Sequence, residues 1–213
     1  TIKGEDVVDY RRMTYREAME NYGNDKPDIR FDMRLKNLNA VAQNKGFKVF
    51  DDAELVVAIN VKNCASYSRK QLDALTAWVK RPQIGMAGVI WCKYNEDGTL
   101  KSSVDKFFNP EALAEWAVVC QSKPGDLMLV LAGPTAKTQK AMSELRLHLA
   151  TELGLRKANE FAPLWVVDFP LLEWDEESQR YHAMHHPFTA PLQEDINQLN
   201  QNPGGMRANA YDL

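Results

Sequence analysis

The sequence has 213 residues, a length that suits one large or two small domains. Hydrophobic residues make up 45% and charged residues 26%, which is ordinary globular usage and excludes a disordered chain. The formal net charge of −3 excludes a uniformly basic nucleic-acid-binding module, although it is compatible with a local basic face.

The three cysteines, Cys64, Cys92 and Cys120, are far apart and form no CxxC pair, so we expect reduced, buried thiols. No window contains the roughly 20 apolar residues that span a bilayer, and the N-terminal TIKGEDVVDYRRM lacks the apolar segment of a signal peptide. These features predict a cytoplasmic protein. The chain lacks an initiator Met and stops in what resembles the start of a strand, so we expect both ends to be internal to a longer protein.

The first predicted helix covers residues 15–22. Thr14 and Glu17 have the spacing of a capping box, and Gly23 suits the position just after the helix. Residues 24–28 (NDKPD) predict a polar turn, with a functional role left open. Apolar and charged residues then alternate over residues 29–35, which predicts a half-buried strand.

Residues 47–153 predict one sheet covered by helices, an α+β fold of the α/β-sandwich type. Short connections leave open whether the strands form parallel crossovers or split pairs. The expected strands are 47–50, 54–61, 86–94 and 127–133, and the expected helices are 69–81 after Ser68, 110–122 after Asn109, and 136–153 before Gly154.

The sequence changes character after residue 155. Residues 163–170 and 171–177 predict two strands, the second running into an acidic turn. Residues 191–207 are rich in Gln, Asn, Pro and Gly, which predicts a mobile loop.

The pair His185–His186 is the one local cluster of chemical interest. Adjacent residues of an extended chain point to opposite sides, so one ring can face a pocket while the other packs behind it. A surface pair or a satisfied core pair is the alternative. No third ligand has a plausible spacing, so we predict no metal site, and no spacing assigns a catalytic residue.

Four segments resemble the bacterial-type aspartyl-tRNA synthetases, which are class II enzymes. They are RMTYREAMENYGNDKPDIRF at 12–31, WVVDFPLLE at 165–173, AMHHPFT at 183–189 and AYDL at 210–213, in the family's order. Between them lies the place where the bacterial enzymes carry their insertion, the GAD domain. SRKQL at 68–72 and DKFF at 105–108 resemble that domain more loosely.

The resemblance implies three segments: residues 1–35 follow class II motif 2, residues 36–153 form the GAD insertion, and residues 154–213 precede motif 3. It implies an aspartate–tRNA ligase, which activates L-aspartate with ATP and Mg²⁺ and transfers it to the 3′ end of tRNA(Asp). The role of aspartate ligand passes to His185, with His186 as a supporting residue. A histidine that donates a hydrogen bond suits a carboxylate of the substrate.

The family's motifs 1, 2 and 3 and its anticodon-binding barrel have no match in these residues. We therefore expect the chain alone to be a monomeric, inactive fragment that binds no cofactor, and the whole enzyme to be a homodimer. Two alternatives stay open: a free-standing GAD-type module that binds RNA or protein, and a fragment of an asparaginyl- or lysyl-tRNA synthetase. The latter enzymes lack the long insertion, so the middle of the chain argues against them.

Overall fold

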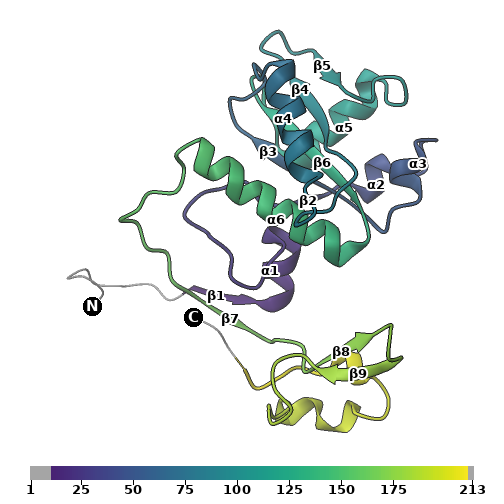
Figure 1. The fold of residues 1–213 in the computed structure, drawn as a ribbon, viewed down its shortest axis with the longest axis vertical. Coiled ribbons are helices and arrows are strands. Elements are labelled where there is room, and N and C mark those ends of the chain that lie inside the picture. Colours follow the sequence, from purple (N-terminus) through teal and green to yellow (C-terminus); the bar gives the residue numbers. More distant parts are fainter. Residues whose placement is uncertain (1–10, 211–213) are drawn as a thin grey trace. The chain divides into compact units, whose positions relative to one another are not determined.

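A computed structural model describes residues 11–210 of the chain (Figure 1). The chain divides into two compact units. The hairpin unit comprises Thr1–Met19, Asp25–Pro27 and Phe161–Leu213, and the sheet unit comprises Glu20–Asn24 and Asp28–Glu160. No helix in the described range is long and apolar enough to cross a membrane.

The sheet unit is built on five strands in the order β2-β3-β6-β4-β5. All neighbouring strands are antiparallel, which answers the question that the sequence pattern left open. The strands are β2 (Lys36–Asn37), β3 (Leu55–Val61), β4 (Ile90–Tyr94), β5 (Leu100–Ser102) and β6 (Leu127–Gly133).

Helices cover both faces of this sheet (Figure 1). The two central strands alternate: Val57 and Leu129 belong to the core on one face, and Val56 and Met128 to the core on the other. The expectation of an α+β fold with one sheet covered by helices is thus confirmed for this unit. Residues of α4 (Arg69–Val79) and α6 (Thr135–Glu152) pack in the first core, and those of α2 (Asn39–Ala42), α3 (Lys48–Asp51) and α5 (Pro110–Cys120) in the second.

The predicted starts of α4 and α5 follow from capping residues and are confirmed, whereas both helices end two residues earlier than predicted. Ser68 and Gln71 form a reciprocal capping box at the start of α4. The side chain of Asn109 accepts a hydrogen bond from the Ala112 N–H, and Pro110 occupies the first turn of α5. Gly154, with a φ of 66°, follows the end of α6.

Three strand predictions need correction. Residues 29–35 form no strand, residues 48–50 belong to the short helix α3 instead of a strand, and the strand expected at 86–94 begins only at Ile90. A four-residue alternation fits a helical turn as well as a strand, because residues three apart share a helix face. Phe47 and Phe50 use that spacing, and both rings contact Phe108.

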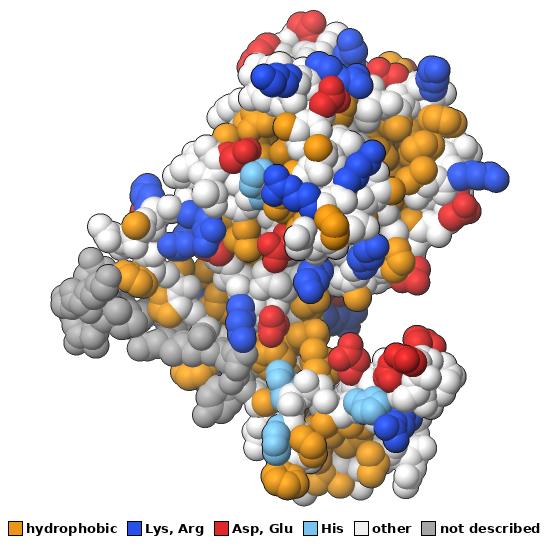
Figure 2. Space-filling model, viewed as in Figure 1, with side chains coloured by type: hydrophobic (Ala, Val, Ile, Leu, Met, Phe, Trp, Pro, Cys, Tyr) orange, Lys and Arg blue, Asp and Glu red, His pale blue; other side chains and the backbone are white. Residues whose placement is uncertain are grey.

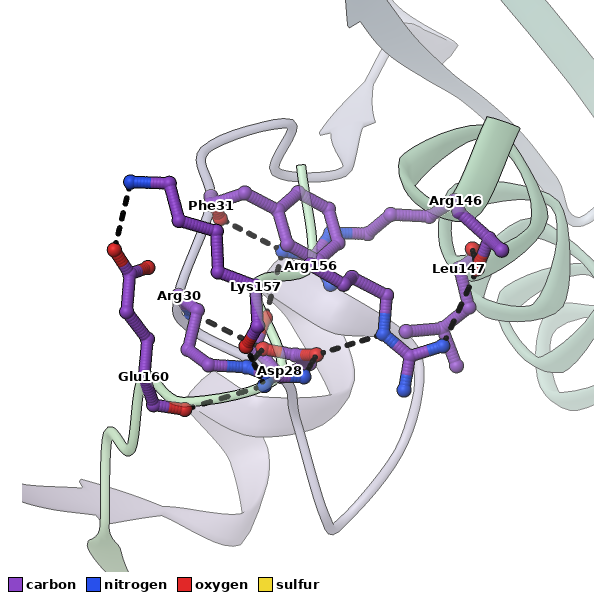
Figure 3. A network of polar contacts seen from close by, with 9 residues as sticks. Asp28, Arg30, Phe31, Arg146, Leu147, Arg156, Lys157 and Glu160 are labelled. Atoms are coloured by element: carbon purple, nitrogen blue, oxygen red, sulfur yellow. Dashed lines mark hydrogen bonds and ion pairs between the residues drawn. The ribbon is translucent and has the colours of Figure 1, made fainter. Parts of the chain in front are cut away.

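Arg146 explains why residues 29–35 are not a strand. Its guanidinium is buried and donates hydrogen bonds to the carbonyl oxygens of Asp28 (2.9 Å), Phe31 (3.0 Å) and Met33 (2.9 Å). Its charged end also lies 3.9 Å from the Phe31 ring centre (Figure 3). An arginine on α6 therefore satisfies backbone groups that a neighbouring strand would otherwise bind.

Asp28 is the centre of a polar cluster beside Arg146 (Figure 3). Arg30 donates to both of its carboxylate oxygens, at 2.9 and 2.6 Å, and Arg156 approaches at 3.2 Å. Nη1 of the same Arg30 guanidinium donates to the carbonyl oxygens of Lys157 (3.0 Å) and Glu160 (3.2 Å). Hydrogen bonds from Arg30 are the main reason that the pKa of Asp28 falls to about 2.

The hairpin unit contains two small sheets. Parallel strands β1 (Arg11–Thr14) and β7 (Leu164–Val167) form one, and antiparallel strands β8 (Leu172–Asp175) and β9 (Arg180–Ala183) form the other. The helix α1 (Tyr15–Tyr22) starts in this unit at the predicted capping box, where the Glu17 N–H donates to Thr14 Oγ1 at 3.1 Å. The predicted helix at 15–22 is confirmed.

Residues 191–207 have more regular structure than their composition predicts. Two 3-10 helices, η1 (Gln193–Gln198) and η2 (Pro203–Gly205), lie in this stretch. Asp195 is only 3% exposed and accepts hydrogen bonds from the backbone N–H and from Nε of Arg207, both at 2.9 Å. The short helices and the pair between buried Asp195 and partly exposed Arg207 give this stretch local order, and its mobility stays a prediction.

Candidate substrate-binding site

The histidine loop, residues 183–189, directly follows β9. The Met184 N–H donates to the Leu171 carbonyl at 3.1 Å, and the Leu171 N–H donates to the Met206 carbonyl at 2.8 Å. These bonds hold the start of the loop beside the segment that follows β7. The sequence brings residues 171 and 184 together because the β8–β9 hairpin folds the chain back on itself.

His185 stands against Phe169, which is completely buried. The two rings meet edge to face, with centroids 4.8 Å apart and planes at 75°. Within residues 11–210, the imidazole nitrogens of His185 have no hydrogen-bond partner, and the residue is exposed. Phe169 orients the ring through apolar contact, so both nitrogens remain available to a ligand.

His186 is engaged within its own loop. Its Nδ1 accepts a hydrogen bond from the Phe188 N–H at 3.2 Å, and its ring contacts the Phe188 ring at 5.0 Å. A neutral His186 therefore carries its proton on Nε2. The two neighbouring histidines thus differ. Within residues 11–210 the ring nitrogens of His185 make no hydrogen bond, whereas His186 stabilises the turn through its bond with the Phe188 N–H. Figure 2 shows histidine side chains at the surface of this unit.

Tyr15 shares an aromatic neighbour with His185. The Tyr15 ring lies 5.2 Å from the Phe169 ring, so Phe169 contacts both Tyr15 and His185. Burial raises the pKa of the Tyr15 hydroxyl, and the charges of Asp25 and Glu173 raise it further. Sequence reasoning missed Tyr15 and Phe169, although both lie in segments that it singled out.

Arg207 anchors the segment of residues 206–208 through several ion pairs. It pairs with Asp195, with Glu194, and with Asp168 at 3.6 Å. Hydrogen bonds to Asp195 are the largest cause of a raised pKa for Arg207 and of a lowered pKa for Asp195. The Ala208 N–H donates to the Phe169 carbonyl at 2.6 Å, so this anchored segment also holds the backbone of the residue that supports His185.

A serine, a histidine and an aspartate meet on the β8–β9 turn but do not form a nucleophilic site. Ser178 Oγ lies 2.5 Å from Asp175 Oδ2 and 2.9 Å from His182 Nε2. The Asp175 carboxylate also accepts the N–H groups of Glu177 and Ser178, which is a turn-forming pattern. All three side chains are exposed or half-buried on the hairpin, so a structural role explains them.

The donor sets of the described residues do not suggest a metal centre. Within residues 11–210, no group of three or more His, Cys, Asp or Glu side chains could hold an ion. No residue of this range is therefore assigned to Mg²⁺.

Comparisons with known proteins identify the family of the chain. Residues 3–213 match the family model of class II tRNA synthetases (D, K and N). The aspartate–tRNA ligase of Flavobacterium psychrophilum is 58% identical over 212 residues, which is 100% of this chain and 36% of that protein. That of Porphyromonas gingivalis is 53% identical over 205 residues, which is 96% of this chain and 35% of that protein.

The chain thus spans about a third of the length of these relatives, since 36% and 35% of them are covered. It shares more than half of its residues with both over nearly all of its own length. The chain therefore belongs to the class II tRNA synthetases of the D, K and N group.

Proposed function

We propose that this chain is part of an aspartate–tRNA ligase, which activates L-aspartate with ATP and transfers it to the 3′ end of tRNA(Asp) in the cytoplasm. The observation that carries the proposal is the open pair of imidazole nitrogens on His185, held in place by a buried Phe169. The relatives quoted above are named aspartate–tRNA ligases, which supports the same substrate.

In this proposal His185 binds a carboxylate of aspartate through a ring N–H. A site that provides a donor favours aspartate over its neutral amide, because the amide NH₂ group cannot accept that hydrogen bond. His186 stiffens the loop through its bond to the Phe188 N–H. Residues 36–153 form the GAD insertion, and the homodimeric enzyme takes ATP with Mg²⁺.

We propose further that the 213 residues alone charge no tRNA. Adenylate formation needs ATP and aspartate held together by convergent groups. The chain is about a third of the relatives' length, at 36% coverage, and of the proposed aspartate site it supplies the histidine loop.

A chimera tests both statements. In it, this chain replaces the matching 36% of the F. psychrophilum ligase. Aspartate-dependent ATP–pyrophosphate exchange is expected from the chimera and not from the isolated chain. Exchange that requires asparagine or lysine in place of aspartate would contradict the proposed substrate, and exchange by the isolated chain would contradict its inactivity.

Substitution of His185 within the chimera tests the proposed ligand. We expect His185→Ala to raise the KM for aspartate at least about tenfold, the cost of roughly one charge-assisted hydrogen bond, with the KM for ATP unchanged. His182→Ala is the matched control, because His182 is an exposed histidine on the adjacent β9. Equal KM values for aspartate in the two variants would show that His185 does not bind the substrate.

A further inference from the structure

A pocket in the sheet unit has no role in the proposed aspartate chemistry. Its volume is about 700 Å³, and its walls come from the segment before β2, the turn after β3 and the turn between α5 and β6. Nine of its twelve lining residues are polar or charged. A polar wall of this kind does not suit an apolar ligand.

Cations outnumber acids around this pocket. Arg34, Lys36, Lys62 and Lys123 line it, against two carboxylates. The positive charge of the pocket lining contrasts with the formal net charge of the whole chain, which is −3. The pocket is therefore a local basic site on an acidic protein.

Both carboxylates already have partners. Asp32 pairs with Lys62 at 3.1 Å. Asp126 is buried and accepts hydrogen bonds from Asn60 Nδ2 at 2.8 Å and from the backbone N–H groups of Asn63 and Lys123, both at 3.0 Å. Its carboxylate thus ties the β3 turn to the turn before β6.

The pocket keeps an excess of two positive charges, because four cations face two carboxylates. Arg34, Lys36 and Lys123 have no ion pair within residues 11–210. Asp126 is held by neutral N–H donors and keeps its charge, and the Arg34 charge also acts on Asp32. Four cations around two carboxylates still repel one another, and an anionic ligand relieves that repulsion.

The backbone around the pocket is unusual as well. Six non-glycine residues in the described range have a positive φ, and three of them, Met33 (102°), Asn63 (58°) and Gln121 (55°), line this pocket. Gln121 is the left-handed C-cap of α5 and asparagine tolerates this region, so the strained position is Met33. The Met33 carbonyl is held by Arg146 Nε at 2.9 Å, which fixes the chain between two of the lining residues, Asp32 and Arg34.

We propose that this pocket binds phosphate groups, with Arg34, Lys36 and Lys123 as the direct contacts. A guanidinium forms paired hydrogen bonds with phosphate oxygens, and two ammonium groups add charge from separate walls. A site of this size with three cations accommodates consecutive phosphates of an RNA backbone or the phosphates of a free nucleotide. The inference does not depend on aspartate activation.

Binding by the full 213-residue chain tests the site. The probes are a fluorescein-labelled RNA of about 12 nucleotides, followed by anisotropy over a series of KCl concentrations, and inorganic phosphate, followed by calorimetry. The pocket variant is Arg34→Gln/Lys36→Gln/Lys123→Gln. The matched control, Lys45→Gln/Lys101→Gln/Lys106→Gln, removes the same charge from exposed positions that do not line the pocket.

We expect the pocket variant to bind the RNA at least about tenfold more weakly and to lower the salt-dependence slope by about 2, whereas the control changes affinity less than about twofold. Phosphate heat that is lost only in the pocket variant would identify a small phosphate ligand and also support the site. Binding of neither probe, or equal losses in both variants, would overturn the proposal. Circular dichroism checks folding, and Lys123→Gln alone, at an exposed turn position, replaces the triple variant if that variant unfolds.

Discussion

The side chain of Arg146 holds the backbone of residues 28–33 in its irregular conformation. Its buried guanidinium donates hydrogen bonds to three carbonyl oxygens of this stretch. We expect Arg146→Met to lower the free energy of unfolding by about 3 kcal/mol, because buried carbonyls lose charged donors. Urea denaturation measures the change.

Arg69→Met is the matched control for this change. Arg69 is exposed and, among residues 11–210, forms an ion pair only with Asp73 one helical turn away, at 2.9 Å. Its loss is expected to cost about 0.5 kcal/mol or less. A cost for Arg146→Met as small as that of the control would show that water replaces the guanidinium without penalty.

Asp28 predicts an acid dependence of stability. Its pKa is about 2 in the folded chain against 3.8 as its ordinary value, so its ionised form is favoured by folding. The stabilisation is complete above the ordinary pKa and is lost as pH falls through the folded pKa, between about pH 5 and pH 1. We expect Asp28→Asn to lose about 1 kcal/mol at pH 7, after allowance for solvent screening, and nothing at the acid end.

Urea titrations of Asp28→Asn and the parent chain at several pH values measure this effect. The two stability curves should converge on acidification. Asp73→Asn, which alters an exposed carboxylate on α4, should shift the curve less at pH 7. Parallel curves for Asp28→Asn at all pH values would contradict the argument.

At the scale of the elements, Gly23 shows how a helix end is tied to its neighbour. Its φ is 73°, and a Cβ there would lie 2.2 Å from the Gln139 carbonyl oxygen on α6. Gly23→Ala must therefore move backbone as well as adopt a left-handed conformation. We expect a loss of about 3 kcal/mol, of which roughly 1 comes from the backbone angle.

Gly46→Ala isolates the contribution of the angle. Gly46 has a φ of 83°, and a Cβ there meets nothing within 4 Å. Thermal unfolding of both variants should show a loss of about 1 kcal/mol for Gly46→Ala and a clearly larger one for Gly23→Ala. Equal losses would mean that α6 moves away from Gly23 at little cost.

The elements also show what the sequence could predict. Helices with local capping residues, such as Ser68 and Asn109, and the buried central strands β3 and β6 were predictable because their signals lie within each segment. The stretch 29–35 was not, because its backbone partner, Arg146, is more than a hundred residues away in sequence. Strand order and direction likewise depend on long-range pairing that periodicity does not encode.

The histidine loop divides in the same way. Its two histidines were identified from sequence, but their different surroundings were not. The contact of His185 with Phe169 and the bond from Phe188 to His186 arise only when the β8–β9 hairpin closes. The basic pocket is a similar case, since its cations come from three separate segments of the chain and the net charge of −3 conceals them.

At the scale of the whole molecule, the sheet unit has what an independent domain needs. Both of its hydrophobic cores are formed by residues between Met33 and Leu149, one on each face of the sheet. Arg30 and Arg156 form ion pairs with Asp28 within the same unit. A segment of this size with its own cores usually folds alone. We therefore predict that residues 20–160, expressed without the rest of the chain, fold cooperatively.

The three cysteines provide the measurement, because all are buried in this unit. Burial raises the pKa of Cys92 and Cys120 to about 12, so folded protein should react slowly with a disulfide reagent such as DTNB. We expect equal labelling rates for residues 20–160 and for the full chain, with a sharp rise at the same urea concentration. Rapid labelling of the excised segment in the absence of urea would show that its cores depend on the hairpin unit.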